Sequence, residues 1–230
     1  MLFQVILMLG LSGSGLASPA AYPRDSSNYP PLSKSKGFNL IVNLNEPDKD
    51  FDPPIHDNFV TTIHVGAGLS KIGTSPLRGP VFFQNGTEES SAAGKSTVIT
   101  LAGTPATPAG FKLTAPDNGG LATGNLDFGV GMPGISIADG PLAYLIPETF
   151  YACEERVEYY RGRRFAIIRH SSDRADAPQH CRAVRLIPQC ASLQALAANA
   201  YGDYDFALES ACYEDVARID WAPGSQVQAN

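Results

Sequence analysis

The sequence predicts a mostly β protein: one β-sandwich-like domain followed by a short, disulfide-tied helical segment at its C-terminus. Two observations favour this fold class. Twenty-two glycines and 18 prolines are spread throughout the 230 residues and interrupt any long helical period. Between them lie about nine short runs with alternating or β-branched residues, at the spacing typical of a sandwich.

The predicted strands follow one another from residue 38 onward. In the first, 38–44, Phe38, Leu40, Val42 and Leu44 share one face because side chains alternate along a strand. The next predicted strands are 60–65, 81–83, 98–101, 111–115 and 142–146. Segments 150–160 and 163–170 flank Gly162 and predict a hairpin, and 181–187 adds the next strand.

The helical prediction is confined to the C-terminal part of the domain. Ser192 can cap a helix over 193–200, and 207–219 has the pattern of a second short helix. A disulfide between Cys190 and Cys212 would tie these two helices together.

The N-terminus has the form of a secretory signal peptide. An apolar run over 2–16 is followed by small residues, which predicts cleavage after Ala17. The predicted organisation is therefore a signal peptide over 1–17, a flexible lead-in over 18–36, the β-sandwich domain over 37–222 and a flexible tail over 223–230. The apolar run is too short to span a bilayer, so we expect a secreted, extracellular protein without a membrane partner.

Four cysteines agree with an oxidising compartment: Cys153, Cys181, Cys190 and Cys212. No two are spaced as closely as zinc ligands usually are, so two disulfides are predicted and no metal site. Three pairings are open. We favour Cys153–Cys181 with Cys190–Cys212, because each closes a local loop.

The net charge of −6 argues against nucleic acid or an anionic membrane as a partner. Eight arginines between 156 and 185 are interleaved with acidic residues. Such a mixture predicts a solvated ladder of ion pairs on a sheet rather than an anion-binding patch.

The stretch NGTEESSAAGKST, residues 85–97, offers two alternatives. Its end resembles a phosphate-binding loop, but Glu89 stands where that motif needs glycine, and a β-branched strand follows where it needs a helix. Its start is the sequon Asn85-Gly86-Thr87, so we predict N-glycosylation at Asn85.

Glu154 and Glu158 form the best catalytic candidate. On a strand they share a face with Arg156, in an arrangement similar to that of β-sandwich glucanases, which carry Asp at the central position. An arginine there favours two ionised carboxylates, which is unsuitable for a general acid. We therefore predict a cross-strand ion ladder, with a hydrolase as the alternative. Other calcium, metal and nucleophile motifs fail at required positions.

Exposed aromatic rings could stack on sugars, and aromatic residues are frequent late in the chain. They are Tyr159, Tyr160, Tyr201, Tyr204, Tyr213 and Trp221. Trp221 is predicted to pack in the core.

Five segments together resemble an uncharacterised family of small secreted proteins of filamentous fungi, a domain of unknown function. They are GFNLIVN (37–43), IHVGAG (63–68), FYAC (150–153), IPQCASL (187–193) and CYEDVARIDW (212–221). The resemblance implies secretion and disulfides, and it carries over no catalytic residue.

These observations favour a secreted, non-catalytic surface or extracellular protein that acts as a binding or interaction module. Its partner would be a cell-wall polysaccharide or an extracellular protein, and no cofactor is predicted. The alternatives are a carbohydrate-active hydrolase using Glu154 and Glu158, and a host-directed effector or antigen.

Overall fold

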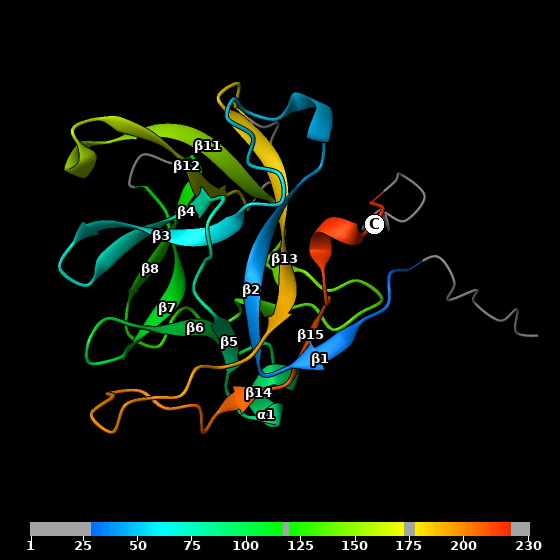
Figure 1. Cartoon of the computed structure of the whole chain (residues 1–230), viewed down its shortest axis with the longest axis vertical. Coiled ribbons are helices and arrows are strands. Elements are labelled where there is room, and N and C mark those ends of the chain that lie inside the picture. Colours follow the sequence, from blue (N-terminus) through cyan, green and yellow to red (C-terminus); the bar gives the residue numbers. More distant parts are fainter. Residues whose placement is uncertain (1–28, 117–119, 173–177, 222–230) are drawn as a thin grey trace, which may run out of the picture.

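A computed structural model describes residues 29–116, 120–172 and 178–221 (Figure 1). The predicted signal peptide and the predicted tail lie outside these residues. The strands are β1 Ser33–Ser35, β2 Gly37–Leu44, β3 Phe59–Gly66, β4 Leu69–Ser75, β5 Phe82–Asn85, β6 Thr97–Ala102, β7 Thr107–Thr114, β8 Ala122–Phe128, β9 Ser136–Ile137, β10 Leu145–Ile146, β11 Phe150–Val157, β12 Arg163–His170, β13 Cys181–Ala191, β14 Ala207–Leu208 and β15 Ser210–Cys212. The helices are all short: α1 Glu88–Ala92 and the 3-10 turns η2 Pro47–Lys49, η3 Glu158–Tyr160 and η4 Val216–Arg218.

The mostly β prediction is confirmed. Eleven strands form one sheet in the order β11-β13-β2-β3-β4-β12-β8-β7-β6-β5-β14, and two further pairs, β1–β15 and β9–β10, flank it. The pairings β11–β12 and β2–β5 close this sheet on itself. Opposite parts of this sheet face each other across one core, as the two sheets of a sandwich do. Here, however, the two parts belong to one sheet and are joined by strand pairing.

The inner face of the closed sheet carries the main core. Phe38, Leu40 and Val42 point inward from β2 and are fully buried, as their alternation predicts. They meet Phe111 of β7 and Ile168 of β12 within the same apolar cluster. Burial of this much apolar surface is the main stabilising term for the fold.

The opposite face of β2 is also covered, which the sequence does not reveal. Ile41 is buried in the same apolar cluster as Tyr213 and Val216 of the C-terminal segment. Tyr213 exchanges backbone hydrogen bonds with Pro188 and Cys190 on β13. Its hydroxyl oxygen accepts a hydrogen bond from the Ala143 N–H at 3.1 Å. At Tyr213 the C-terminal segment therefore pairs in parallel with the edge of β13, beside the β1–β15 pair (Figure 1).

The predicted C-terminal helices are wrong. Residues 193–200 contain no helix, and 207–219 forms β14, β15 and the single turn η4. The unpaired edges of β5 and β1 provide backbone hydrogen-bond partners for β14 and β15. Leu193 and Tyr204 pack on the cluster around Phe83, so tertiary contacts override the helix propensity of this alanine-rich stretch.

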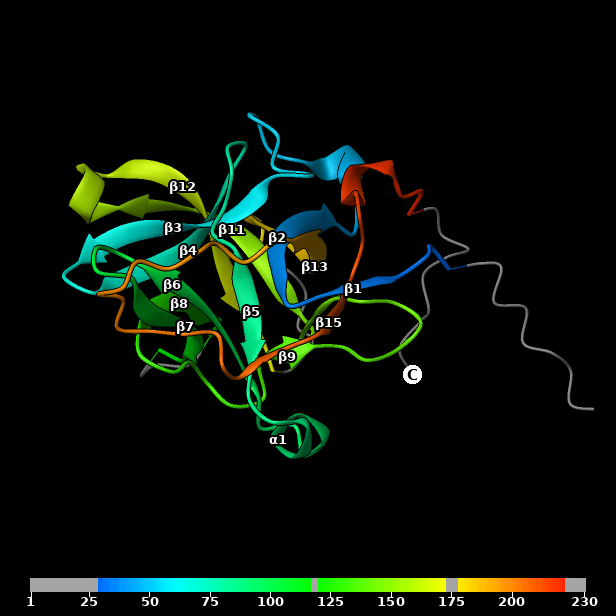
Figure 2. The same cartoon turned by 60° about the horizontal axis from the view of Figure 1, so that its bottom comes forward.

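Both favoured disulfides are present. Cys153–Cys181 joins β11 to β13, and Cys190–Cys212 joins β13 to β15 rather than two helices. Ser33–Ser35 pairs with β15, so the end of the predicted flexible lead-in belongs to the folded domain. The remaining turn elements project outward, with α1 below the end of β5 (Figure 2).

Candidate functional site

The β11–β12 hairpin carries the interleaved charges and forms as predicted. Glu155 receives two hydrogen bonds from Arg169, at 2.5 and 2.6 Å, and Lys71 of β4 lies 3.8 Å from the same carboxylate. Arg169 also donates to the Thr123 hydroxyl on β8. This network links four strands, and its members satisfy one another, so it is a structural ion network.

The structure does not bring Glu154 and Glu158 onto one strand face. Strand β11 ends at Val157, and Glu158 begins the 3-10 turn η3, so the alternation stops before it reaches Glu158. Glu154 pairs with Arg164 at 3.4 Å across the hairpin. The predicted ion ladder is therefore present, whereas the same-face arrangement of the two carboxylates is wrong.

A groove of about 660 Å³ lies between the two hairpins β3–β4 and β11–β12, which are stacked in the upper part of Figure 1. We call it the hairpin groove. Hydroxyl groups of Thr61, Thr62 and Thr74 line it together with the charged side chains of Glu154 and Arg164. A groove lined in this way offers both donors and acceptors to a hydroxyl-rich ligand.

A row of aromatic rings continues from the hairpin groove toward the hairpin tip. Phe165 lines the groove and lies 5.0 Å from the Tyr160 ring. Tyr160 lies 5.3 Å from Tyr159, which meets His64 of β3 edge-on at 5.1 Å. Tyr159 is 56% exposed and Tyr160 37% exposed, so this aromatic row presents apolar ring surface to solvent.

The other candidate aromatic residues have different surroundings. Tyr213 is buried, and Trp221 packs edge-on against it at 5.7 Å; Trp221 is half-buried, so it lies at the edge of the core rather than inside it as predicted. Tyr204 packs against Phe83 at 5.1 Å. Tyr201 is 76% exposed and lies beside the β6–β7 turn, where its N–H donates to Ala106.

The sequon lies at the outer end of β5, and Asn85 is half-buried there. The predicted loop after it contains the short helix α1, whose first turn is capped by the Thr87 hydroxyl oxygen. Glycosylation of Asn85 stays a prediction.

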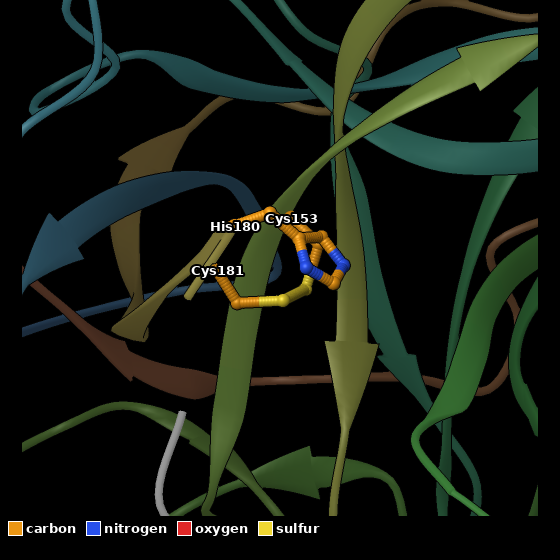
Figure 3. Close-up of side chains that lie close together, drawn as sticks. All are labelled: Cys153, His180 and Cys181. Carbon is orange, nitrogen blue, oxygen red and sulfur yellow. A yellow bond between two sulfur atoms is a disulfide. The ribbon is translucent and has the colours of Figure 1, made fainter. Parts of the chain in front are cut away.

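Cys153, His180 and Cys181 form a cluster with the spacing of a metal site (Figure 3). The imidazole of His180 lies beside the bond between the two sulfur atoms. Because both sulfurs are joined in a disulfide, neither is the thiolate that a zinc site requires.

The acidic stretch over residues 48–52, which resembles the start of a calcium loop but carries Pro53 where that loop needs glycine, has a local structural role. The Asp50 carboxylate accepts hydrogen bonds from the backbone N–H groups of Phe51, Ile55 and His56 at 2.7 to 3.1 Å. His56 in turn accepts from the Leu44 N–H at 3.2 Å. These bonds fix the loop that forms one wall of the hairpin groove.

None of the helices formed by the described residues has the length and hydropathy to span a membrane. Residues 35–190 match the family described as Domain of unknown function (DUF7907). The chain is also 40% identical, over 218 residues, to Antigenic protein SchS34 of Stachybotrys chartarum, a match that covers 90% of this chain and 98% of that protein. No solved structure matches the chain significantly.

Proposed function

The chain belongs to this family of unknown function, and from that premise we propose that it is an extracellular, non-catalytic protein that binds a cell-wall polysaccharide in the hairpin groove. The observation that carries the proposal is the continuity of the groove with the exposed aromatic row from Phe165 to Tyr159.

Polysaccharides present two kinds of surface, and this site has a counterpart for each. The apolar faces of sugar rings pack on aromatic rings, which Tyr159 and Tyr160 expose. Sugar hydroxyls exchange hydrogen bonds with threonine hydroxyls, carboxylates and guanidinium groups, which line the groove beside them.

An extracellular location is supported by three observations. Two disulfides are stable in an oxidising compartment. The apolar N-terminus has the form of a signal peptide. The Stachybotrys chartarum relative is named an antigenic protein, and a protein outside the cell is accessible to antibodies.

The test is a pull-down of the secreted protein on insoluble chitin, β-glucan and cellulose, with the supernatant assayed for released sugars. We expect retention on at least one polysaccharide and no sugar release. The double variant Tyr159→Ala/Tyr160→Ala should weaken retention roughly three- to tenfold, because it removes the exposed ring faces.

The matched control is Tyr201→Ala, which removes an equally large exposed ring outside the groove and should bind as the natural protein does. Retention that is insensitive to Tyr159 and Tyr160 would place the ligand elsewhere. Sugar release that is lost in Glu154→Gln would instead identify a hydrolase. No retention on any of the three polysaccharides would overturn the proposal and favour a protein partner.

A further inference from the structure

A second hollow lies where the segment that joins β9 to β11 meets β13. It consists of two adjoining cavities of about 170 and 80 Å³, which share Tyr144, Glu148 and Arg185 as lining residues. Arg185 comes from β13, and the other two come from the segment around β10. The volumes suit a ligand smaller than a typical drug molecule.

The cationic side of this hollow is formed by Arg185, whose charge acts on the Tyr144 phenol. Arg185 is half-buried and makes no hydrogen bond or ion pair with any residue that the structure describes. Asn43 lies directly opposite Arg185 in the β2–β13 register, so both side chains leave the same face. Asn43 is only 4% exposed, and its amide nitrogen also lacks a partner among the described residues. Asn43 lines neither cavity, so the Arg185 guanidinium is the cationic group of the hollow, and a guanidinium without a hydrogen-bond partner among the described residues favours binding of an anion.

The other side of the hollow offers an acceptor that is held in place. The Tyr144 hydroxyl donates to Glu148 at 2.8 Å. Burial, followed by this hydrogen bond, raises the pKa of Tyr144, so the phenol stays protonated and continues to donate. One carboxylate oxygen of Glu148 is thereby positioned, and the other is left to accept from a ligand.

The backbone next to Glu148 is strained in the way often found at binding sites. Thr149 has a φ of 76°, which is rare for a β-branched residue. Its carbonyl accepts a hydrogen bond from the Ser171 N–H at 3.1 Å, which holds the segment against β12. Glu148 is therefore presented by a fixed loop rather than by a free one.

We propose that this hollow binds a small carboxylate that also carries hydroxyl or amino donors, with Arg185 holding the carboxylate and Glu148 accepting from the donors. A polyanion such as phosphate fits less well, because Glu148 and Asp139, which also lines the larger cavity, would repel it, whereas both carboxylates can accept from ligand donors. Sugar acids and amino acids both combine a carboxylate with hydroxyl or amino donors, and the titration below distinguishes between these two classes of ligand.

The test is a ligand-observed NMR titration of the full secreted protein with D-glucuronate, L-serine and neutral D-glucose. We expect saturable binding of at least one of the two carboxylates and none of glucose. Arg185→Gln should weaken that binding at least tenfold, because a charge-assisted contact is lost. Glu148→Gln should weaken it about threefold or more, because an uncharged amide is a poorer acceptor.

The matched control is Arg218→Gln, which removes an exposed arginine outside the hollow and should leave affinity unchanged. Binding of only one carboxylate identifies its source as sugar acid or amino acid. If Arg185→Gln does not fold, as judged by circular dichroism, Glu148→Gln decides alone. Equal binding of glucose, no saturable binding of either carboxylate, or full affinity in both variants would overturn the proposal.

Discussion

At the scale of single residues, His170 makes stability depend on pH. It is half-buried at the end of β12, where its ring meets Phe150 at 5.3 Å. Burial lowers the pKa of His170, and a hydrogen bond with the backbone of Glu148 opposes this effect. The unfolded chain therefore binds the proton more readily, with a pKa of about 6.5. Stability is fully present above pH 6.5 and is lost as the pH falls through the lower pKa of the folded state.

We expect His170→Gln to make this loss smaller, because glutamine takes up no proton. The measurement is the free energy of unfolding in urea at several pH values between 7.5 and 5. His180→Gln is the control, since His180 is exposed and should keep the dependence of the natural protein. A variant at position 170 with an unchanged pH dependence would show that other groups govern acid sensitivity.

Whether the role of a single residue can be predicted from sequence depends on whether its interaction partner lies nearby in a regular element of the chain. The ion ladder was predictable because Glu154 and Arg164 are diagonal neighbours across a short hairpin. The role of Asp50 was not, because its carboxylate binds backbone groups up to six residues away in an irregular loop. Gly110 is a similar case: a Cβ there would lie 2.0 Å from the Gly131 nitrogen, a close approach that only the fold creates.

At the scale of elements, the Cys190–Cys212 disulfide holds the C-terminal segment in place. It anchors β15 to β13, and β15 in turn pairs with β1. The bridge spans 22 residues, for which the chain-entropy model gives about 3 kcal/mol. We expect Cys190→Ala/Cys212→Ala to lower the free energy of unfolding in urea by about that amount and to speed hydrogen exchange in β1 and β15.

The comparison is Cys153→Ala/Cys181→Ala, whose bridge spans 28 residues and should contribute a similar free energy. Its loss should leave hydrogen exchange in β1 and β15 slow, because neither strand is joined to it. Equal exchange in the two double variants would contradict a local role for Cys190–Cys212.

Strands and hairpins could be predicted from sequence where the residue pattern that defines them lies within the element itself. The hairpin around Gly162 and the alternation of Phe38 through Leu44 emerged from sequence because both depend on neighbouring residues. The C-terminal strands did not, because β14 and β15 exist only through pairing with β5 and β1, more than 100 residues away. The hairpin groove escaped prediction for the same reason, since its walls come from distant parts of the chain.

At the scale of the whole molecule, the closed sheet places nearly every strand around one core. Strand β2 illustrates this, since it pairs with β3, β5 and β13 and is covered on both faces. The hairpin groove and the Arg185 hollow are therefore carried by one framework rather than by separate domains. Sequence indicated a single domain of this length, but the closure arises from registers between distant strands, which local patterns do not encode.

Because the strands of the sheet share one main core, we expect the protein to unfold in a single transition. Trp221 is the single tryptophan and packs against Tyr213 at the edge of the main core, so its fluorescence reports on the C-terminal segment. Far-ultraviolet circular dichroism reports on the sheet as a whole. With both disulfides intact, we expect the two signals to change at the same urea concentration, because cooperative units unfold together. An earlier change in fluorescence would show that the C-terminal segment detaches first and that the rest of the sheet is stable without it.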